Sequence, residues 1–306
     1  MTSAGPIGGS VASSTRRSRA AWMIAAFMLA APVSALRPSR YMSPMARLEE
    51  AIRMSQFDLT GRRALITGSG QGIGFALAEA LANAGASVLL NGRDGAKLDR
   101  AAGALRATGA RVDTIAFDVT DSDAVAAGVA HIEAELGPID ILVNNAGIQR
   151  RAPLQDFPHD TWHELMGTNL DSVFYVAQAV ARHMIPRGRG KIVNVCSVQS
   201  ELGRPGIAPY AASKGAVKML TKGMCADWAK FGLQVNGLGP GYFKTELTKA
   251  LVEDPQFTAW LCSRTPAGRW GRVEELGGAM VFLASSASDF VNGQVIYVDG
   301  GMTSVV

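Results

Sequence analysis

The sequence predicts an α/β fold, a single doubly wound parallel sheet with helices on both faces. Short apolar runs typical of buried strands alternate with helix-like segments, and a glycine-rich turn joins the first strand to the first helix. A hydrophobic content of 48% with 34 glycines in 306 residues suits one large, compact α/β domain. We therefore expect a Rossmann-type domain over residues 54–306, preceded by a separate N-terminal extension over residues 1–53.

The net charge and the cysteine content limit the expected ligands and the expected cellular compartment. Residues 1–53 hold seven arginines and two glutamates, a balance of +5, which leaves 23 basic and 24 acidic residues, or −1, for residues 54–306. This near-neutral body gives no argument for nucleic-acid binding. The three cysteines, Cys196, Cys225 and Cys262, are an odd number without CxxC or metal-ligand spacing. We expect no disulfide framework, no metal site and a cytoplasmic location.

The N-terminal extension carries features of a targeting signal. Three arginines within residues 16–19 precede an uncharged run over residues 20–36, which is typical of a secretory or twin-arginine signal. This run of 17 residues contains Pro32 and is short for a bilayer span, which needs about 20. Three interpretations stay open: a non-native or dispensable extension ahead of Met54, an export signal, and a membrane anchor. We expect the extension to be poorly ordered and residues 54–306 to make no membrane contact.

The first predicted strand and helix frame a dinucleotide-binding turn. An apolar run over residues 63–67 is followed by spaced glycines over residues 68–74, and helical periodicity extends over residues 72–84. The first glycine permits the turn, and the later ones let the backbone approach a pyrophosphate and the helix approach the sheet. The residues predicted to contact the cofactor here are Gly68, Ser69, Gly72, Ile73 and Gly74.

The end of the second predicted strand, residues 86–91, bears on the choice of cofactor. A site for NAD usually places an acidic residue there to bind the ribose hydroxyls. This chain has Gly92 and Arg93 instead, and a guanidinium fork fits a 2′-phosphate. We therefore predict NADP(H) as the cofactor with Arg93 as a phosphate ligand; a solvated arginine beside Asp94 is the alternative. Gln71 adds no second cation, so we do not expect a strict preference for NADP.

Two polar positions follow in the middle of the chain. The predicted fourth strand, residues 140–143, leads into a loop whose small residues let a cofactor ribose lie close to the backbone: Asn145, Ala146 and Gly147. A purely structural role for this loop is the alternative. Asn169 lies inside a predicted long helix over residues 157–184, although asparagine is a mediocre helix former, so its presence there calls for a reason.

The stretch from Tyr210 to Lys214 carries the chemistry. In a predicted helix over residues 209–231 these two side chains stand four residues apart on one face, which places the ammonium beside the phenol. A phenol with a reference pKa of about 10 needs such a neighbour to act as an acid/base at neutral pH. Ser197, just after an apolar strand over residues 191–195, precedes Tyr210 by thirteen residues.

Taken together, the glycine turn, the asparagine loop, the serine and the tyrosine–lysine pair resemble the short-chain dehydrogenase/reductase family from about Phe57 to the C-terminus. The resemblance implies an oxidoreductase in which Ser197 donates to the substrate carbonyl and Tyr210 transfers the proton. It implies that Lys214 lowers the tyrosine pKa and holds the nicotinamide ribose. It further implies that Asn169 disturbs its helix and completes a proton relay through a bound water.

The same resemblance implies contacts with the adenine. Asp118, at the end of a predicted third strand over residues 113–119, is placed to meet the adenine amino group, with Val119 alongside. Capping of the next helix, through Thr120 and Asp121, is another role open to Asp118.

The segment after the predicted sixth strand is implied to close over the site. Pro240 and Gly241 end that strand, and Thr245 is positioned to reach the cofactor pyrophosphate or carboxamide. Residues 241–270 form a long excursion rich in lysine, threonine and aromatic residues, which suits a mobile substrate lid. A last strand over residues 292–299 lies at an edge that commonly helps form a homotetramer in this family.

Three segments indicate a polar, anionic small-molecule substrate. They lie around Arg151, around Gln199 and Glu201, and around Trp260, and they are similar to those of gluconate 5-dehydrogenases, also called 5-keto-D-gluconate 5-reductases. We expect Arg151 to bind the carboxylate of a sugar acid, Ser197 its carbonyl, and the other two polar side chains its hydroxyls. A surface role for the arginine stays open. The alternative functions are another sugar or polyol dehydrogenase, a 3-oxoacyl carrier-protein reductase, and a non-catalytic NADP-binding protein.

Overall fold

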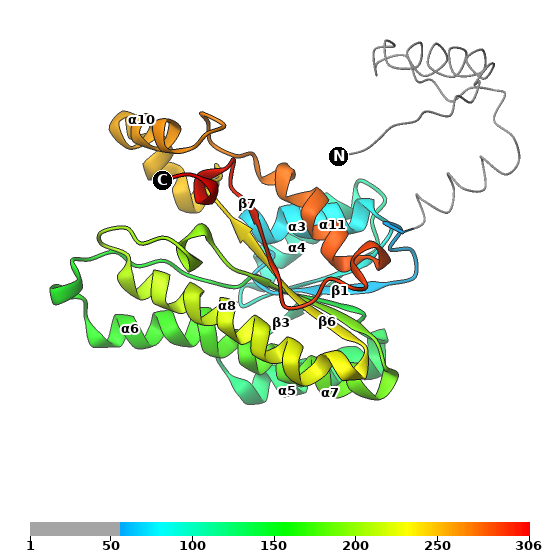
Figure 1. The fold of residues 1–306 in the computed structure, drawn as a ribbon. Helices are drawn as coiled ribbons and strands as arrows, with labels where there is room; N and C mark the ends of the chain where they lie inside the picture. Colours follow the sequence, from blue (N-terminus) through cyan, green and yellow to red (C-terminus); the bar gives the residue numbers. More distant parts are fainter. Residues whose placement is uncertain (1–55) are drawn as a thin grey trace, which may run out of the picture. The chain divides into compact units, whose positions relative to one another are not determined.

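The computed structural model describes residues 56–306, so the predicted extension over residues 1–53 lies outside the described residues. The described part is organised around one seven-stranded, all-parallel sheet with the order β3-β2-β1-β4-β5-β6-β7, which confirms the predicted fold class (Figure 1). The strands are β1 (Arg63–Ile66), β2 (Ser87–Gly92), β3 (Val112–Ala116), β4 (Ile141–Asn144), β5 (Gly190–Val195), β6 (Leu233–Pro240) and β7 (Val295–Val298).

Helices cover both faces of the sheet and enclose two apolar cores. On one face lie α3 (Gly72–Asn83), α4 (Gly95–Arg106) and α11 (Gly277–Ala284) (Figure 1). On the other face lie α5 (Ser122–His131), α6 (His159–Met166), α7 (Ser172–Arg187) and α8 (Ala208–Trp228). Leu77, Leu98 and Met280 belong to the first core, and Val176 and Val217 to the second. Both faces of the parallel strands are therefore buried, which explains their near-continuous apolar sequences.

The order of the strands reverses between β1 and β4. Their registers pair Ala64 with Ile141 and Ile66 with Val143, so both strands end at the same edge of the sheet. In open parallel sheets ligands bind in the crevice at such a switch point, outside the carboxyl ends of the strands. The glycine turn follows β1 and the Asn145 loop follows β4, so the topology brings the two predicted cofactor segments together.

The predicted long helix over residues 157–184 is divided in two. After α6, a π-helical turn (η4, Gly167–Asp171) precedes α7. Asn169 in this turn directs its amide to the backbone of Ile148 on the neighbouring loop, with contacts of 2.8 and 2.9 Å. Single π-helical turns inside α-helices are frequent at functional sites.

The prediction that Asp118 caps the next helix is wrong. Asp121 is the cap of α5, because its carboxylate accepts from the N–H groups of Asp123 at 2.9 Å and Ala124 at 3.0 Å. β3 ends at Ala116, earlier than predicted, and the carboxylate of Asp118 instead accepts from the N–H of Thr120 at 2.9 Å.

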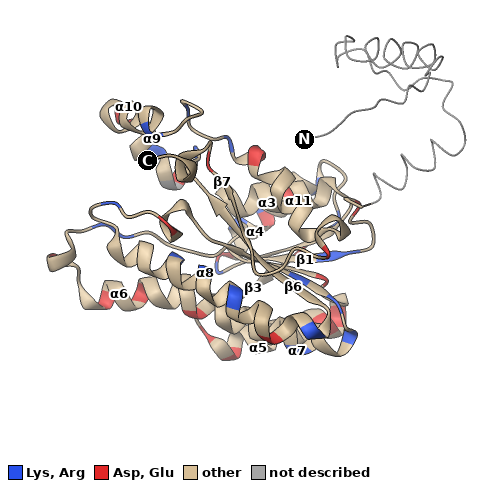
Figure 2. Ribbon diagram, viewed as in Figure 1, with Lys and Arg blue, Asp and Glu red and all other residues tan. Residues whose placement is uncertain are grey.

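The excursion over residues 241–270 contains two short α-helices. These are α9 (Lys249–Val252) and α10 (Pro255–Arg264), and the C-terminal segment returns beside them (Figure 1). Arg264 donates to the carbonyl of Met302, which ties α10 to that segment. Over residues 56–306, no helix is long and apolar enough to cross a membrane. Acidic and basic residues are interspersed along the outer helices of this part (Figure 2).

Candidate active site

A cavity of about 410 Å³ opens at the carboxyl ends of the strands. It is lined by both sides of the switch point, by the start of α8 and by the segment after β6, so it joins motifs that lie far apart in the sequence. The predicted residues that line it are Gly68, Gly72, Ile73, Gly74, Arg93, Asp118, Val119, Asn145, Ala146, Gly147, Arg151, Ser197, Gln199, Tyr210, Lys214, Pro240, Gly241 and Thr245.

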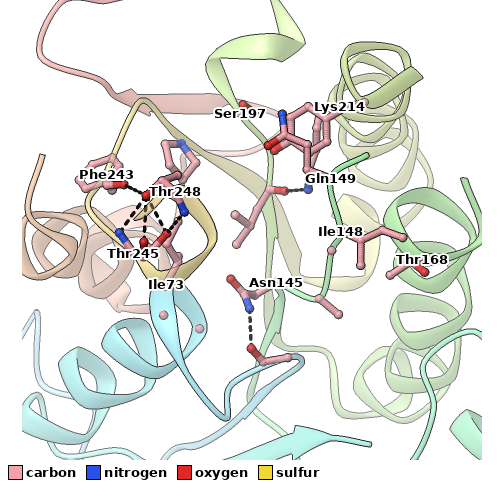
Figure 3. A pocket seen from close by; sticks show the side chains of 18 of the residues that line it. Ile73, Asn145, Ile148, Gln149, Thr168, Ser197, Lys214, Phe243, Thr245 and Thr248 are labelled. Carbon is pink, nitrogen blue, oxygen red and sulfur yellow. Dashed lines mark hydrogen bonds between the residues drawn. The ribbon is translucent and has the colours of Figure 1, made fainter. Parts of the chain in front are cut away.

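The glycine turn is packed closely against the loop after β4. The amide of Asn145 donates to the carbonyls of Thr67 at 2.9 Å and Gly68 at 3.0 Å (Figure 3). A Cβ atom at Gly74 would stand 2.4 Å from that amide nitrogen and 2.5 Å from the Gly68 oxygen, a separation that no side chain can occupy. Glycine at this position is therefore a requirement of the close approach, as the sequence predicts.

The same turn has the properties of a dinucleotide site. Gly72 has a φ of +61°, and a Cβ atom there would meet nothing within 4 Å among the described residues. Helix α3 begins at this glycine without a side-chain cap or an acidic residue in its first turn, within the part of the chain that the structure describes. The first N–H groups of α3 are thus left for an anion at the cavity, and the residues present fit a pyrophosphate.

Ser69 does not line the cavity, contrary to its predicted role as a cofactor contact. Its side chain is completely buried; the hydroxyl donates to the carbonyl of Ile66 at 2.8 Å and accepts from the N–H of Asn91 at 3.1 Å. These bonds tie the glycine turn to the ends of β1 and β2. Ser69 is therefore a residue that shapes the turn.

Arg93 and Asp118 form the outer end of the cavity. The guanidinium of Arg93 is 3.5 Å from the carboxylate of Asp118, and the arginine side chain is 76% exposed. Burial acts to raise the pKa of Asp118, but hydrogen bonds from Thr120 and the charge of Arg93 together hold it below its usual value. The carboxylate is therefore ionised at neutral pH, and Arg93 remains open to a second anion on its exposed side.

Ser197, Tyr210 and Lys214 meet at the inner end of the cavity. Ser197 lies directly after β5 and its Oγ accepts from the N–H of Gln199 at 3.1 Å. Tyr210 and Lys214 are on the same face of α8, with the ammonium 6.0 Å from the centre of the phenol ring. The ammonium donates to the carbonyl of Val195 at 2.7 Å, so β5 and α8 hold the three groups in one place. Figure 3 shows Ser197 and Lys214 on the same side of the cavity.

Burial dominates the ionisation of the tyrosine–lysine pair. It raises the pKa of Tyr210, while the Ser197 hydroxyl beside the phenol acts in the opposite direction. Burial also lowers the pKa of Lys214. The sequence implied a lowered tyrosine pKa; the structure has a raised one because the phenolate would be desolvated and the ammonium is directed to Val195. Tyr210 is thus protonated at neutral pH.

Asn169 lies behind the cavity wall and is not itself a lining residue. Its side chain is completely buried, and its amide bonds to both backbone groups of Ile148 and to the hydroxyl of Ser213 at 3.2 Å. Ser213 neighbours Lys214 on α8, and Ile148 follows the Asn145 loop. Asn169 therefore connects the loop after β4 to the helix that carries Tyr210 and Lys214.

The predicted substrate residues divide into two groups. Arg151, Ser197 and Gln199 line the cavity. Arg150, the neighbour of Arg151 in the chain, was not a predicted contact and forms a two-point ion pair with Glu164 at 2.7 and 3.1 Å. Glu201 is not among the lining residues of the described part; its carboxylate binds the ammonium of Lys218 and the hydroxyl of Tyr297. The structure therefore removes Glu201 from the predicted substrate contacts, because both partners hold it outside the cavity.

Several lining residues were not singled out from the sequence. Arg204 and Tyr242 line the same end of the cavity as Arg151, and Thr248 fixes Thr245 by accepting and donating hydrogen bonds within one turn (Figure 3). The aromatic content of residues 241–270 was the available signal. It did not indicate which ring would face the substrate, because that depends on the tertiary packing of the excursion. Residues 56–306 contain no group of three acidic, histidine or cysteine residues arranged to hold a metal ion.

The chain belongs to the short-chain dehydrogenase/reductase family and is an oxidoreductase. A family model described as enoyl-(acyl carrier protein) reductase matches residues 68–303. The gluconate 5-dehydrogenase of Gluconobacter oxydans is 66% identical over 247 residues, which cover 81% of this chain and 96% of that protein. The 5-keto-D-gluconate 5-reductase of Escherichia coli is 56% identical over 250 residues, covering 82% and 98%.

A solved structure of a gluconate 5-dehydrogenase is also similar to this chain. The crystal structure of a gluconate 5-dehydrogenase from Burkholderia cenocepacia in complex with NADP and tartrate is 64% identical, with a TM-score of 0.82. The match covers 83% of this chain and 100% of that one. These similarities bear out the predicted family and its resemblance to gluconate 5-dehydrogenases.

Proposed function

We propose that this protein is an NADP(H)-dependent oxidoreductase that interconverts D-gluconate and 5-keto-D-gluconate. One observation carries the proposal: a relative named gluconate 5-dehydrogenase is 66% identical over 96% of its length. The cavity supports it independently, because Arg151 and Gln199 face the same space as the serine, tyrosine and lysine of the catalytic group. A carboxylate-bearing polyol fits such a combination of charge and hydrogen-bonding groups.

The residues that would hold the cofactor follow from the cavity lining. The first turn of α3 would bind the pyrophosphate, and Arg93 would bind the 2′-phosphate. Asp118 and Val119 would contact the adenine, and the Asn145 loop the ribose. Thr245 would contact the pyrophosphate or the carboxamide. The NADP in the Burkholderia structure supports this choice of cofactor. NADPH, when bound, supplies the hydride for carbonyl reduction.

The chain's own residues would manage the proton. Ser197 would donate a hydrogen bond to the substrate carbonyl, and the phenol of Tyr210 would give its proton to the oxygen. The raised pKa of Tyr210 keeps that proton in place until it is needed. Lys214 would stabilise the phenolate that remains and hold the nicotinamide ribose, and Asn169 would complete a proton relay through a water. Oxidation would use the same groups in reverse.

Two further properties belong to the proposal. We propose a homotetramer by analogy with the family, in which the edge formed by the last strand, here β7, commonly helps form the assembly; exposed apolar side chains such as Phe174 on α7 and Met219 on α8 are compatible with association. Light scattering on the full chain would report its mass. We also propose a cytoplasmic location, since the three cysteines are free thiols.

The direct test is NADPH oxidation followed by absorbance with the full chain and 5-keto-D-gluconate. NADH and an acetoacetyl thioester serve as the competing cofactor and the competing substrate. We expect turnover with NADPH and the keto acid to exceed both competitors. Preferential reduction of the thioester would retain the catalytic group but refute the sugar-acid assignment. A non-catalytic role is disfavoured because the catalytic serine, tyrosine and lysine all line one cavity.

A further inference from the structure

Arg204 is a second arginine at the substrate end of the cavity. It comes from the loop after the short turn that begins at Ser197, and its guanidinium lies 5.2 Å from the centre of the Phe257 ring on α10. Its Nε atom is buried and has no hydrogen-bond partner among the described residues. A buried, unpaired N–H group costs free energy unless a ligand satisfies it.

Arg151 lies at the same end of the cavity, and its side chain is more exposed than that of Arg204. Its one polar contact in the described part is with the side-chain oxygen of Gln149 at 3.4 Å, a long distance for a hydrogen bond. Burial and the nearby charge of Arg204 both lower the pKa of Arg151. Two guanidiniums thus share one end of the cavity, and neither forms an ion pair with an acidic residue of residues 56–306, although Glu246 also lines the cavity. Glu201 and Glu164 are bound to Lys218 and Arg150.

Gln199 completes this end of the cavity. It is only 8% exposed, and its Oε1 atom has no hydrogen-bond partner in the described structure. Its Nε2 atom is 3.5 Å from the hydroxyl of Tyr242, and both arginine charges act to lower the pKa of that phenol against the effect of burial. The unpaired acceptor suits a hydroxyl donor, and the unpaired Nε–H of Arg204 beside the charge of Arg151 suits an anion.

We propose that Arg204 is a specificity-determining residue that binds the substrate's carboxylate together with Arg151. This proposal rests on the proposed function and extends it. Phe257 presents the Arg204 guanidinium by cation–π contact, so anion binding is linked to the position of α10. A site with two guanidiniums discriminates a keto acid from a neutral ketose of the same size, and it also accepts a dianion such as tartrate.

Steady-state kinetics with Arg204→Met test the proposal. The methionine keeps an apolar stem against Phe257 and removes the charge. We expect the KM for 5-keto-D-gluconate to rise about ten- to hundredfold with a much smaller change in kcat, because one charge-assisted contact is lost. The KM for D-fructose, a neutral ketose, should not change. Arg204→Lys should restore part of the affinity, and Arg100→Met, at an exposed position on α4, controls for the loss of one charge.

Tartrate binding, measured by calorimetry on the full chain loaded with NADP, separates this proposal from the proposed function. We expect the wild type to bind tartrate and Arg204→Met to bind it at least tenfold more weakly, with Phe257→Leu weakening it less. Equal binding by wild type and Arg204→Met, or no binding by the wild type, would overturn the role of Arg204. If the protein does not turn over 5-keto-D-gluconate but the wild type still binds tartrate more tightly than Arg204→Met, only the identity of the sugar acid is refuted.

Discussion

Two parts of the cavity are built in different ways. The cofactor wall consists of the glycine turn and the Asn145 loop, and the substrate wall of Arg151, Gln199 and Arg204. At the cofactor wall, backbone segments approach closely and side chains bond to them: Asn145 to Thr67 and Gly68, and Ser69 to Ile66 and Asn91. At the substrate wall, side chains from separate segments converge, and polar atoms of Gln199 and Arg204 stay unpaired within the described residues. The glycine turn is thus held in place by hydrogen bonds within the protein, whereas the substrate wall presents side-chain atoms that are open to a ligand.

This difference has a physical reason. Every cofactor of this class presents the same pyrophosphate and ribose, so a fixed arrangement of glycines and backbone N–H groups can be reused. A substrate differs from one relative to another, and its recognition depends on a few side chains placed by loops. If the two walls act independently, a substitution in one should leave the properties of the other unchanged.

The largest expected effect is a loss of kcat on substitution of Tyr210, which lies where the two walls meet. Tyr210→Phe removes the proton donor and leaves the ring in place, so we expect kcat to fall by about a hundredfold to ten-thousandfold, the usual contribution of a positioned acid/base. NADPH affinity, measured by cofactor fluorescence, should stay near that of the wild type. Retained turnover would refute the assigned role.

The pH dependence should differ between the two directions. Because burial raises the pKa of Tyr210, the phenol keeps its proton through neutral pH and loses it only in the alkaline range. Reduction needs the protonated form, so its kcat should hold through neutral pH and fall at alkaline pH. Oxidation needs the phenolate, so its rate should rise with pH, by about tenfold per unit where this one ionisation controls it. Parallel profiles in the two directions would contradict the assignment.

The close packing of the cofactor wall predicts a loss of stability. Gly74→Ala places a methyl group 2.4 Å from the amide of Asn145, and overpacking of this kind costs about 1–3 kcal/mol in the free energy of unfolding. Gly203→Ala is the matched control, since a Cβ atom there would meet nothing within 4 Å in the described part. Urea denaturation of both variants measures the difference. Similar midpoints would show that the turn is looser than its contacts indicate.

The smallest effect is expected at the exposed end of the cofactor wall. Arg93→Ala should raise the KM for NADPH by up to about tenfold and leave that for NADH nearly unchanged, since only NADPH carries the 2′-phosphate. The high exposure of Arg93 limits the effect because water screens the charge. Initial rates with both cofactors provide the comparison, and equal changes in the two KM values would remove Arg93 from cofactor selection.

The sequence was informative about the cofactor wall because its requirements are local. The glycines, the strand that precedes them and the helix that follows are adjacent in the chain, so spacing alone predicts the geometry. The tyrosine and lysine are one helical turn apart, and their common face also follows from spacing. The order of the strands, by contrast, depends on how these units stack, and it was not predicted from the sequence.

The substrate wall was harder to predict because its contacts are distant in sequence. Glu201 was expected at the substrate, but its hydroxyl partner, Tyr297, comes from β7, 96 residues later. Arg204 was passed over because Phe257, the ring that orients it, lies on α10. For Asp118, only the helix-capping role was wrong, and for a local reason: Asp121 is closer to the start of α5 and caps it.

The measurement that tests the central claim most directly is identification of the product by NMR. The full chain would be incubated with NADPH and 5-keto-D-gluconate, and the product compared with authentic D-gluconate and with its C5 epimer. We predict that D-gluconate forms in step with NADPH consumption. Formation of the epimer, or no consumption of the keto acid while another carbonyl compound is reduced, would contradict the proposed reaction.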